Sequence, residues 1–121
     1  MNGKRLLAID DEIEFGTFIR KAGQRLGFEV RFTTDVREFK ALYESFDPTV
    51  IAVDVVMPDS DGIELVRWLE SRNCAARVMI ISGFDPRYAR AAEIIGNVEK
   101  RMSVVRLRKP VSLADLEKAL I

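Results

Sequence analysis

Five side chains with the chemistry of phosphoryl transfer stand where predicted strands end. They are Asp10, Asp11, Asp54, Ser82 and Lys109. Each follows an apolar or alternating run, and the carboxyl ends of parallel strands meet at one edge of a sheet. The spacing therefore predicts one site that combines carboxylates, a hydroxyl and an ammonium group.

The predicted clustering of carboxylates requires a counter-charge. Two carboxylates a few ångströms apart repel by roughly 4 kcal/mol at an intermediate effective dielectric constant. A divalent cation removes this repulsion, and Mg²⁺ prefers oxygen ligands while keeping several of its waters. We expect Asp11 and Asp54 to bind Mg²⁺ directly and Asp10 to bind it through water.

The same residues suggest a phosphoacceptor. An unprotonated Asp54 could attack phosphorus in line and form an acyl phosphate on the protein itself. Lys109 would stabilise the charge that develops on the phosphoryl oxygens. Ser82 could donate a hydrogen bond to one of these oxygens and draw its loop inward. We expect a switch and not an enzyme with turnover.

Length and composition restrict the class of protein. A chain of 121 residues, 48% of them hydrophobic, predicts a single domain over 1–121. The 19 basic and 19 acidic residues cancel, which argues against direct binding to nucleic acid or an anionic membrane. With Cys74 as the single cysteine and no histidine, an internal disulfide is excluded and a zinc cluster is implausible. No apolar run reaches the roughly 20 residues of a membrane span, so we expect a cytoplasmic protein.

Five segments have the pattern of strands. The segments 6–9, 50–53 and 78–81 are continuously apolar, which is typical of strands covered on both faces of a parallel sheet. The segments 29–33 and 105–108 alternate, which is typical of half-exposed edge strands. We expect the first group in the middle of the sheet and the second at its edges.

Apolar residues at helical spacing separate these segments. The spacing predicts helices over 15–26, 36–46, 63–69 and 86–98, and a fifth helix from Ser112 onward. Pro86 suits a first helical turn, and Ser112 with Asp115 has the pattern of a capping box. Gly27 and Asn73 are predicted helix stops.

Five strands that alternate with five helices predict a doubly wound α/β fold of the flavodoxin-like kind. We expect a parallel sheet in the order 2-1-3-4-5 with helices on both faces. In this order a crevice opens between the carboxyl ends of the first and third strands, where Asp10, Asp11 and Asp54 stand. Residues 58–62 are predicted to form a turn.

With these residues in view, the chain resembles the receiver domain of two-component response regulators, the CheY-like family, over nearly its whole length. The matching motifs are Ile9-Asp10-Asp11-Glu12, Asp54-Val55-Val56-Met57-Pro58 with Asp61-Gly62, Ser82-Gly83 and Lys109-Pro110. Each motif alone is weak. In this order, with each at a strand end, they are highly specific.

The resemblance implies that Asp54 accepts a phosphoryl group from a phosphohistidine of a sensor histidine kinase or phosphotransfer protein, with Mg²⁺ required. It implies that the backbone carbonyl of Val56 completes the metal site and that the domain catalyses its own dephosphorylation. The signal would leave through the fourth helix, fifth strand and fifth helix toward an unknown downstream protein. The same face is a candidate homodimer contact.

Two departures from the family concern this output face. The position three residues before the lysine is usually aromatic in the family, but here it is Arg106. Ser82 and Lys109 are 27 positions apart, several more than is usual, and the additional residues fall around 96–103. Both departures leave the acidic site unchanged, so we expect the chain to keep the phosphorylation chemistry while its output response differs from the common one.

Other interpretations fit parts of the pattern. A receiver-like interaction module would keep the fold and the acids without being phosphorylated, and would use the Arg106 region for docking. A phosphatase-type hydrolase fits less well, because the run Asp10-Asp11-Glu12 after the first strand offers no separate acid/base residue. A flavin-binding protein fits less well, because the loop there lacks the Ser, Thr and Gly that would bind a phosphate. Singly, Asp10 could be a helix cap, Ser82 a turn residue and Lys109 a solvated lysine. Together they favour the switch.

Overall fold

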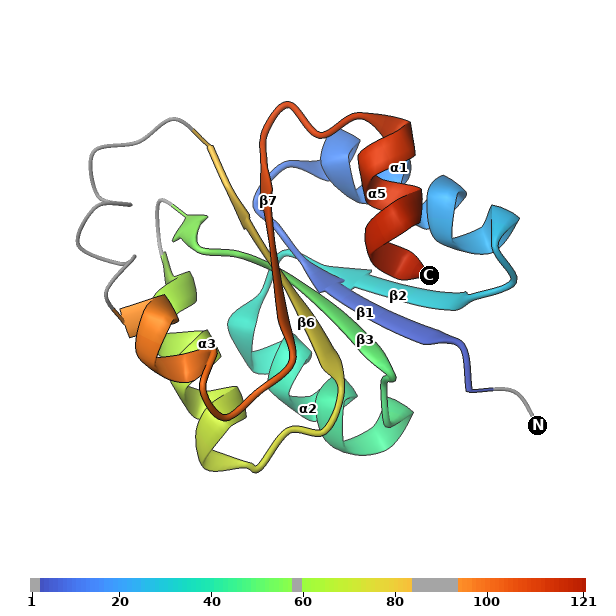
Figure 1. Ribbon diagram of the computed structural model, residues 1–121. Helices are drawn as coiled ribbons and strands as arrows, with labels where there is room; N and C mark the ends of the chain where they lie inside the picture. Colours follow the sequence, from blue (N-terminus) through green and yellow to red (C-terminus); the bar gives the residue numbers. More distant parts are fainter. Residues whose placement is uncertain (1–2, 58–59, 84–93) are drawn as a thin grey trace.

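The computed structural model describes residues 3–57, 60–83 and 94–121, and its main sheet has five parallel strands (Figure 1). These strands are β1 Arg5–Ile9, β2 Glu29–Thr33, β3 Val50–Asp54, β6 Arg77–Ser82 and β7 Val104–Arg108. They lie in the order β2-β1-β3-β6-β7. The predicted order 2-1-3-4-5 and the flavodoxin-like fold are confirmed.

Helices cover both faces of this sheet (Figure 1). The complete helices are α1 Ile13–Arg25, α2 Val36–Phe46, α3 Gly62–Ser71 and α5 Leu113–Leu120, and residues 94–98 are also helical. The predicted start of the fourth helix at Pro86 lies outside the described residues. Within the described segments, no helix is long and apolar enough to cross a membrane.

Two hydrophobic clusters, one on each face of the sheet, form the core. Leu6 and Ala8 pack with α1 and α5, whereas Leu7 and Ile9 pack with α2, α3 and the helical residues 94–98. Successive side chains of a strand point to opposite faces, so a strand covered on both sides is apolar at every position. Strands β2 and β7 keep exposed positions, as expected for edges.

The predicted helix ends are largely confirmed. Ser112 caps α5 by accepting a hydrogen bond from the Asp115 backbone N–H at 3.0 Å. Gly27 and Asn73 follow α1 and α3 with φ angles of 86° and 55°, a left-handed conformation that ends a helix. The N-cap of α1 is Glu12 rather than Asp10.

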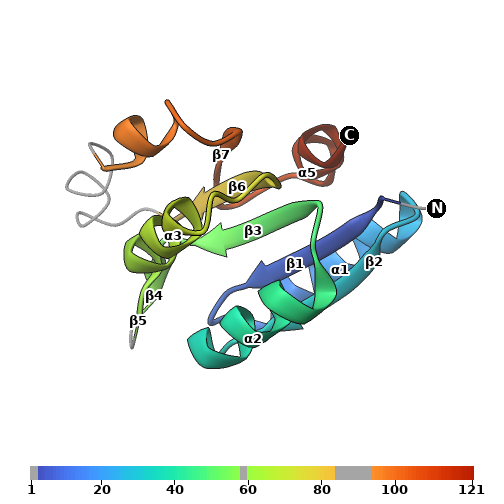
Figure 2. The same ribbon diagram turned by 90° about the horizontal axis from the view of Figure 1, so that it is seen from below.

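Residues 58–59 of the predicted turn at 58–62 lie outside the described residues, and two short strands that the sequence does not indicate flank them. Strands β4 Val56–Met57 and β5 Ser60–Asp61 form a small antiparallel pair outside the main sheet, beside α3 (Figure 2). Two residues per strand are too few to show a period, so a sequence pattern does not reveal such a pair.

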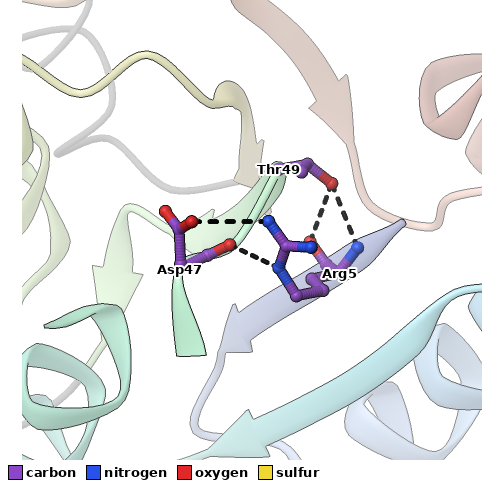
Figure 3. Close-up of polar contacts among 3 residues, drawn as sticks. All are labelled: Arg5, Asp47 and Thr49. Carbon is purple, nitrogen blue, oxygen red and sulfur yellow. Dashed lines mark hydrogen bonds and ion pairs between the residues drawn. The ribbon is translucent and has the colours of Figure 1, made fainter. Parts of the chain in front are cut away.

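The amino ends of the central strands are joined by a polar network around Arg5 (Figure 3). Its Nε donates to the Asp47 carbonyl at 2.6 Å, and its Nη2 lies 3.5 Å from Asp47 Oδ2. The Thr49 hydroxyl accepts from the Arg5 backbone N–H at 3.0 Å and donates to the Arg5 carbonyl at 3.2 Å. This network ties the chain that leaves α2 to the first residue of β1.

Candidate functional site

The predicted site residues lie at the carboxyl ends of the strands, opposite the Arg5 network. Asp10 follows β1, Asp54 ends β3 and Lys109 follows β7. Lys109 Nζ lies 2.9 Å from Asp10 Oδ2 and 3.6 Å from Asp54 Oδ2. The Lys109 backbone N–H also donates to the Ser82 carbonyl at 2.8 Å, which joins the end of β7 to the end of β6. One ammonium group thus bridges carboxylates that are far apart in sequence.

Asp10 is the most deeply buried of these charged groups, with 1% of its surface exposed. Its Oδ1 accepts a hydrogen bond from the Glu12 backbone N–H at 2.8 Å. Its Oδ2 is paired in charge with Lys109 but receives no hydrogen bond of good geometry from the described residues. Burial raises the pKa of Asp10, and the Glu12 N–H and Lys109 only partly oppose this. Burial of this carboxylate is therefore only partly compensated, and a further positive charge near Oδ2 would stabilise it.

Lys109 is surrounded by acceptors. Besides Asp10 and Asp54, its Nζ contacts the carboxylate of Glu12 and lies 4.8 Å from the centre of the Phe15 ring. Burial alone would lower the pKa of Lys109, but its close contacts with the carboxylates of Glu12 and Asp10 outweigh burial and raise it. The lysine is therefore firmly charged at neutral pH.

Asp54 is held in place by the close approach of α3. The residue is 3% exposed and is the last of β3. A Cβ atom on Gly62, the first residue of α3, would clash with the Asp54 carbonyl oxygen and with Cα of Val55. Only glycine lets the helix start this close to the strand. Gly62 of the Asp61-Gly62 motif thus has a packing role beside Asp54.

The acids after β1 suit a hard divalent cation. Asp10, Asp11 and Glu12 each offer a carboxylate oxygen, and these oxygens lie within 4.8 Å of one another. This donor set, which includes an Asp10 Oδ2 that accepts no hydrogen bond from the described residues, matches the all-oxygen coordination that Mg²⁺ prefers. Val56, the residue with the predicted metal-binding carbonyl, begins β4 opposite Asp61. Its role as a ligand stays a prediction.

Ser82 lies at the same edge. It is 6% exposed, ends β6 and is paired in register with Arg108 of β7. Its carbonyl positions the Lys109 backbone, as described above. The hydrogen bond from its hydroxyl to a phosphoryl oxygen stays a prediction.

Two contacts of Lys109 were not predicted from the sequence. Glu12 stood in the first motif without an assigned role, and Phe15 was counted only in a helical stripe. Both lie at the start of α1, and both contact the ammonium group. The signal that could have found Glu12 is the third consecutive acid after a buried strand, because that much negative charge needs a cation nearby.

A hollow of about 490 Å³ opens beside the lysine. The residues that line it include Glu12, Phe15, Phe18, Lys109, Pro110 and Val111. Its walls are largely apolar, and the charged residues of the lining are Glu12, Glu14 and Lys109. A planar or apolar group of a partner could enter next to the carboxylates.

Arg106, which departs from the family pattern, forms an ion pair on the surface. Its Nε and Nη2 lie 3.0 and 2.5 Å from the two carboxylate oxygens of Glu99. Glu99 directly follows the helical residues 94–98, and Arg106 is in β7. The two-pronged contact ties the longer segment before β7 to that strand.

Comparisons with known proteins agree with this arrangement. Residues 6–121 match the family described as the response regulator receiver domain. The chain is 31% identical to the response regulator receiver protein CpdR of Brucella abortus, over 93% of this chain and 90% of that protein. It is 28% identical to the photosynthetic apparatus regulatory protein RegA of Rhodobacter capsulatus, covering 98% of this chain but 61% of RegA.

The fold matches a CheY-like receiver domain protein from Methanospirillum hungatei with a TM-score of 0.84 at 20% identity, over 97% of this chain and 90% of that one. The chain belongs to the family of response regulator receiver domains.

Proposed function

We propose that residues 1–121 form a single receiver domain that acts in the cytoplasm as a phosphorylation-controlled switch, with Asp54 as the phosphoacceptor. Receiver domains are signalling switches, which supports a regulatory role without turnover. The observation that carries the proposal is the position of the Lys109 ammonium, 2.9 Å from Asp10 and 3.6 Å from Asp54. An ammonium group at this position can pair with the Asp54 carboxylate before transfer and with the phosphoryl oxygens after it.

In the proposed transfer, a carboxylate oxygen of Asp54 attacks phosphorus of a phosphohistidine on a sensor histidine kinase or phosphotransfer protein. The new O–P bond forms as the P–N bond breaks, and the leaving imidazole nitrogen keeps the electron pair and takes up a proton from solvent. Lys109 pairs with the phosphoryl oxygens as their charge increases. The Ser82 hydroxyl, at the end of the neighbouring strand, donates to one of them.

Asp10, Asp11 and Asp54 would hold Mg²⁺, with the Val56 carbonyl as a further ligand. When bound, Mg²⁺ neutralises the acids and lets a phosphoryl dianion approach them. The Oδ2 of Asp10, which accepts no hydrogen bond from the described residues, and the neighbouring oxygens of Asp11 and Glu12 support this assignment. The chain's own contribution is to bury the acceptor and to keep Lys109 charged beside it.

The hollow next to Lys109 is the proposed entry for the donor. Its apolar walls at Phe15, Phe18 and Val111 suit an imidazole ring and the helix that carries it. The outgoing signal would pass from Ser82 along β6 and β7 toward the face that carries Arg106, and from there to an unknown protein target. The same face is the proposed contact for a homodimer.

The test is incubation with a small phosphodonor, such as acetyl phosphate, and Mg²⁺, followed by intact mass measurement. We expect one phosphoryl group on the wild type and none on Asp54→Asn. Asp35→Asn is the matched control, because Asp35 caps α2 near the same edge of the sheet and Asn caps helices as well as Asp. A phosphoryl group that persists on Asp54→Asn would reject Asp54 as the acceptor.

The result also separates the two functions that the sequence leaves open. A receiver-like interaction module would remain unmodified with any donor while still binding its partner. Chelation of Mg²⁺ by EDTA should prevent modification of the wild type if the proposed mechanism is correct. Modification at an undiminished rate in EDTA would remove the metal from the mechanism.

A further inference from the structure

Glu12 uses its side chain in an unusual way for the first residue of a helix. It is the N-cap of α1, yet its side chain makes no capping hydrogen bond. The carboxylate instead contacts Nζ of Lys109, 97 positions later in the chain. The first turn of α1 thus gives up a local hydrogen bond and gains a contact with the lysine.

The lysine is held on the α1 side of the acids. Its Nζ lies closer to Glu12 and Asp10 than to Asp54, whose Oδ2 is 3.6 Å away, within ion-pair range but beyond a good hydrogen bond. The Phe15 ring, also in the first turn of α1, lies 4.8 Å from Nζ on the same side. Asp10 and Asp54 are buried, whereas the Glu12 side chain is 59% exposed.

We propose that Glu12 is a positioning residue that holds Lys109 against the start of α1 in the unphosphorylated protein and releases it to the phosphoryl group on Asp54. This inference rests on the proposed phosphoacceptor function. The contact is suited to release, because an ion pair with a mostly exposed partner is weak. A phosphoryl group on Asp54 brings more negative charge to the buried side of the lysine than the single carboxylate of Glu12 offers on the exposed side.

The hold has a kinetic consequence. While Lys109 is paired with Glu12, the Glu12 carboxylate offsets part of the positive potential that Lys109 produces at Asp54. Each transfer therefore requires the lysine to leave Glu12. Removal of the Glu12 charge should therefore speed phosphorylation, and the gain should depend on Lys109. A general effect of negative charge on an anionic donor would not depend on the lysine.

The first test observes the hold without phosphorylation. The NMR signal of the Lys109 ammonium group, assigned from Lys109→Met, is compared in the wild type, Glu12→Gln and Glu14→Gln. Glu14 is the matched control, since it is an exposed acid of the same helical turn and lines the same hollow. We expect a clear shift or faster exchange of the signal in Glu12→Gln and little change in Glu14→Gln. An unchanged signal in Glu12→Gln would overturn the inference.

The second test measures the rate of phosphorylation by acetyl phosphate at saturating Mg²⁺ in a double-mutant cycle. We expect Glu12→Gln to raise the rate about two- to fivefold, the size expected for loss of a partly exposed ion pair. We expect no such gain when the same change is made in Lys109→Met. No gain in either background, or an equal gain in both, would overturn the inference. If the wild type accepts no phosphoryl group, the proposed function and the release step both fail, while the NMR comparison still decides whether Glu12 holds the lysine.

Discussion

The two ends of the main sheet each hold a basic side chain in a polar network, but the balance of charge differs. At the amino end, the described contacts of Arg5 include the carboxylate and the carbonyl of Asp47 and the Thr49 hydroxyl. At the carboxyl end, Lys109 faces the carboxylates of Asp10, Glu12 and Asp54, with Asp11 beside them. Among the described residues, the Arg5–Asp47 contact pairs one basic group with one acid, whereas Lys109 is outnumbered by the carboxylates around it.

This difference separates a structural network from a functional one. Paired charges and backbone groups at the amino end stabilise the join between α2, β1 and β3 with little long-range field. Surplus carboxylates at the other end cost folding free energy, and in the proposed function they bind a cation and take part in phosphoryl transfer. Four predictions follow from this contrast, and each acts on one end only.

The largest effect is expected from Lys109→Met. Without the ammonium group, the buried carboxylates of Asp10 and Asp54 lose their shared counter-charge, and we expect the free energy of unfolding to fall by about 2–3 kcal/mol in metal-free buffer. Mg²⁺ should restore part of this loss. The measurement is urea denaturation with and without MgCl₂. Lys21→Met, at an exposed position of α1, is the control and should change little. An equal loss in both variants would show that the carboxyl end is not strained.

Asp10→Asn should raise the free energy of unfolding, whereas Lys109→Met should lower it. Because burial raises the pKa of Asp10 above its ordinary value of 3.8, the folded state binds this proton more tightly than the unfolded state does. This group therefore costs stability as the pH rises above about 3.8. We expect Asp10→Asn to be more stable than the metal-free wild type at neutral pH by about 0.5–2 kcal/mol.

The pH and metal dependence make this second prediction specific. The advantage of Asp10→Asn should shrink as the pH is lowered toward 3.8, and the stabilisation by Mg²⁺ should largely disappear in the variant. Thermal denaturation at several pH values, with EDTA or MgCl₂, measures both. A variant that is less stable than the wild type at neutral pH would mean that the ion pair with Lys109 outweighs the burial of Asp10.

These two predictions depend on geometry that the sequence could indicate only in outline. The apolar runs identify the strands, and their ends bring Asp10, Asp54 and Lys109 to one edge, because parallel strands have few alternative orders. The contact between Glu12 and Lys109 was not predictable in this way, since a long side chain on a helix start can point in several directions. The sequence did not indicate the β4–β5 pair or the Arg106–Glu99 contact. Each involves too few residues to show the hydrophobic periodicity of a strand or helix.

At the amino end, Thr49→Val should cost stability without changing the site. The hydroxyl makes two hydrogen bonds to the backbone of Arg5, and valine has the same shape but makes neither. We expect a loss of about 1 kcal/mol in the free energy of unfolding. The stabilisation by Mg²⁺ and the rate of phosphorylation should equal those of the wild type. A change in either would mean that the two ends of the sheet are coupled.

The smallest effect is expected from Asp47→Gly, and it shows which atom of Asp47 matters. The carboxylate is 92% exposed and lies 3.5 Å from Arg5 Nη2, a weak surface ion pair, whereas the carbonyl accepts from Nε at 2.6 Å. Asp47 has a φ of 52°, which glycine adopts without strain. The relief of backbone strain therefore offsets the lost ion pair. We expect the free energy of unfolding to stay within about 0.5 kcal/mol of the wild type. Arg5→Met, which removes the bond to the carbonyl as well, should cost more. If the order of the two variants were reversed in urea denaturation, the amino end would depend on its carboxylate, and the contrast with the carboxyl end would be lost.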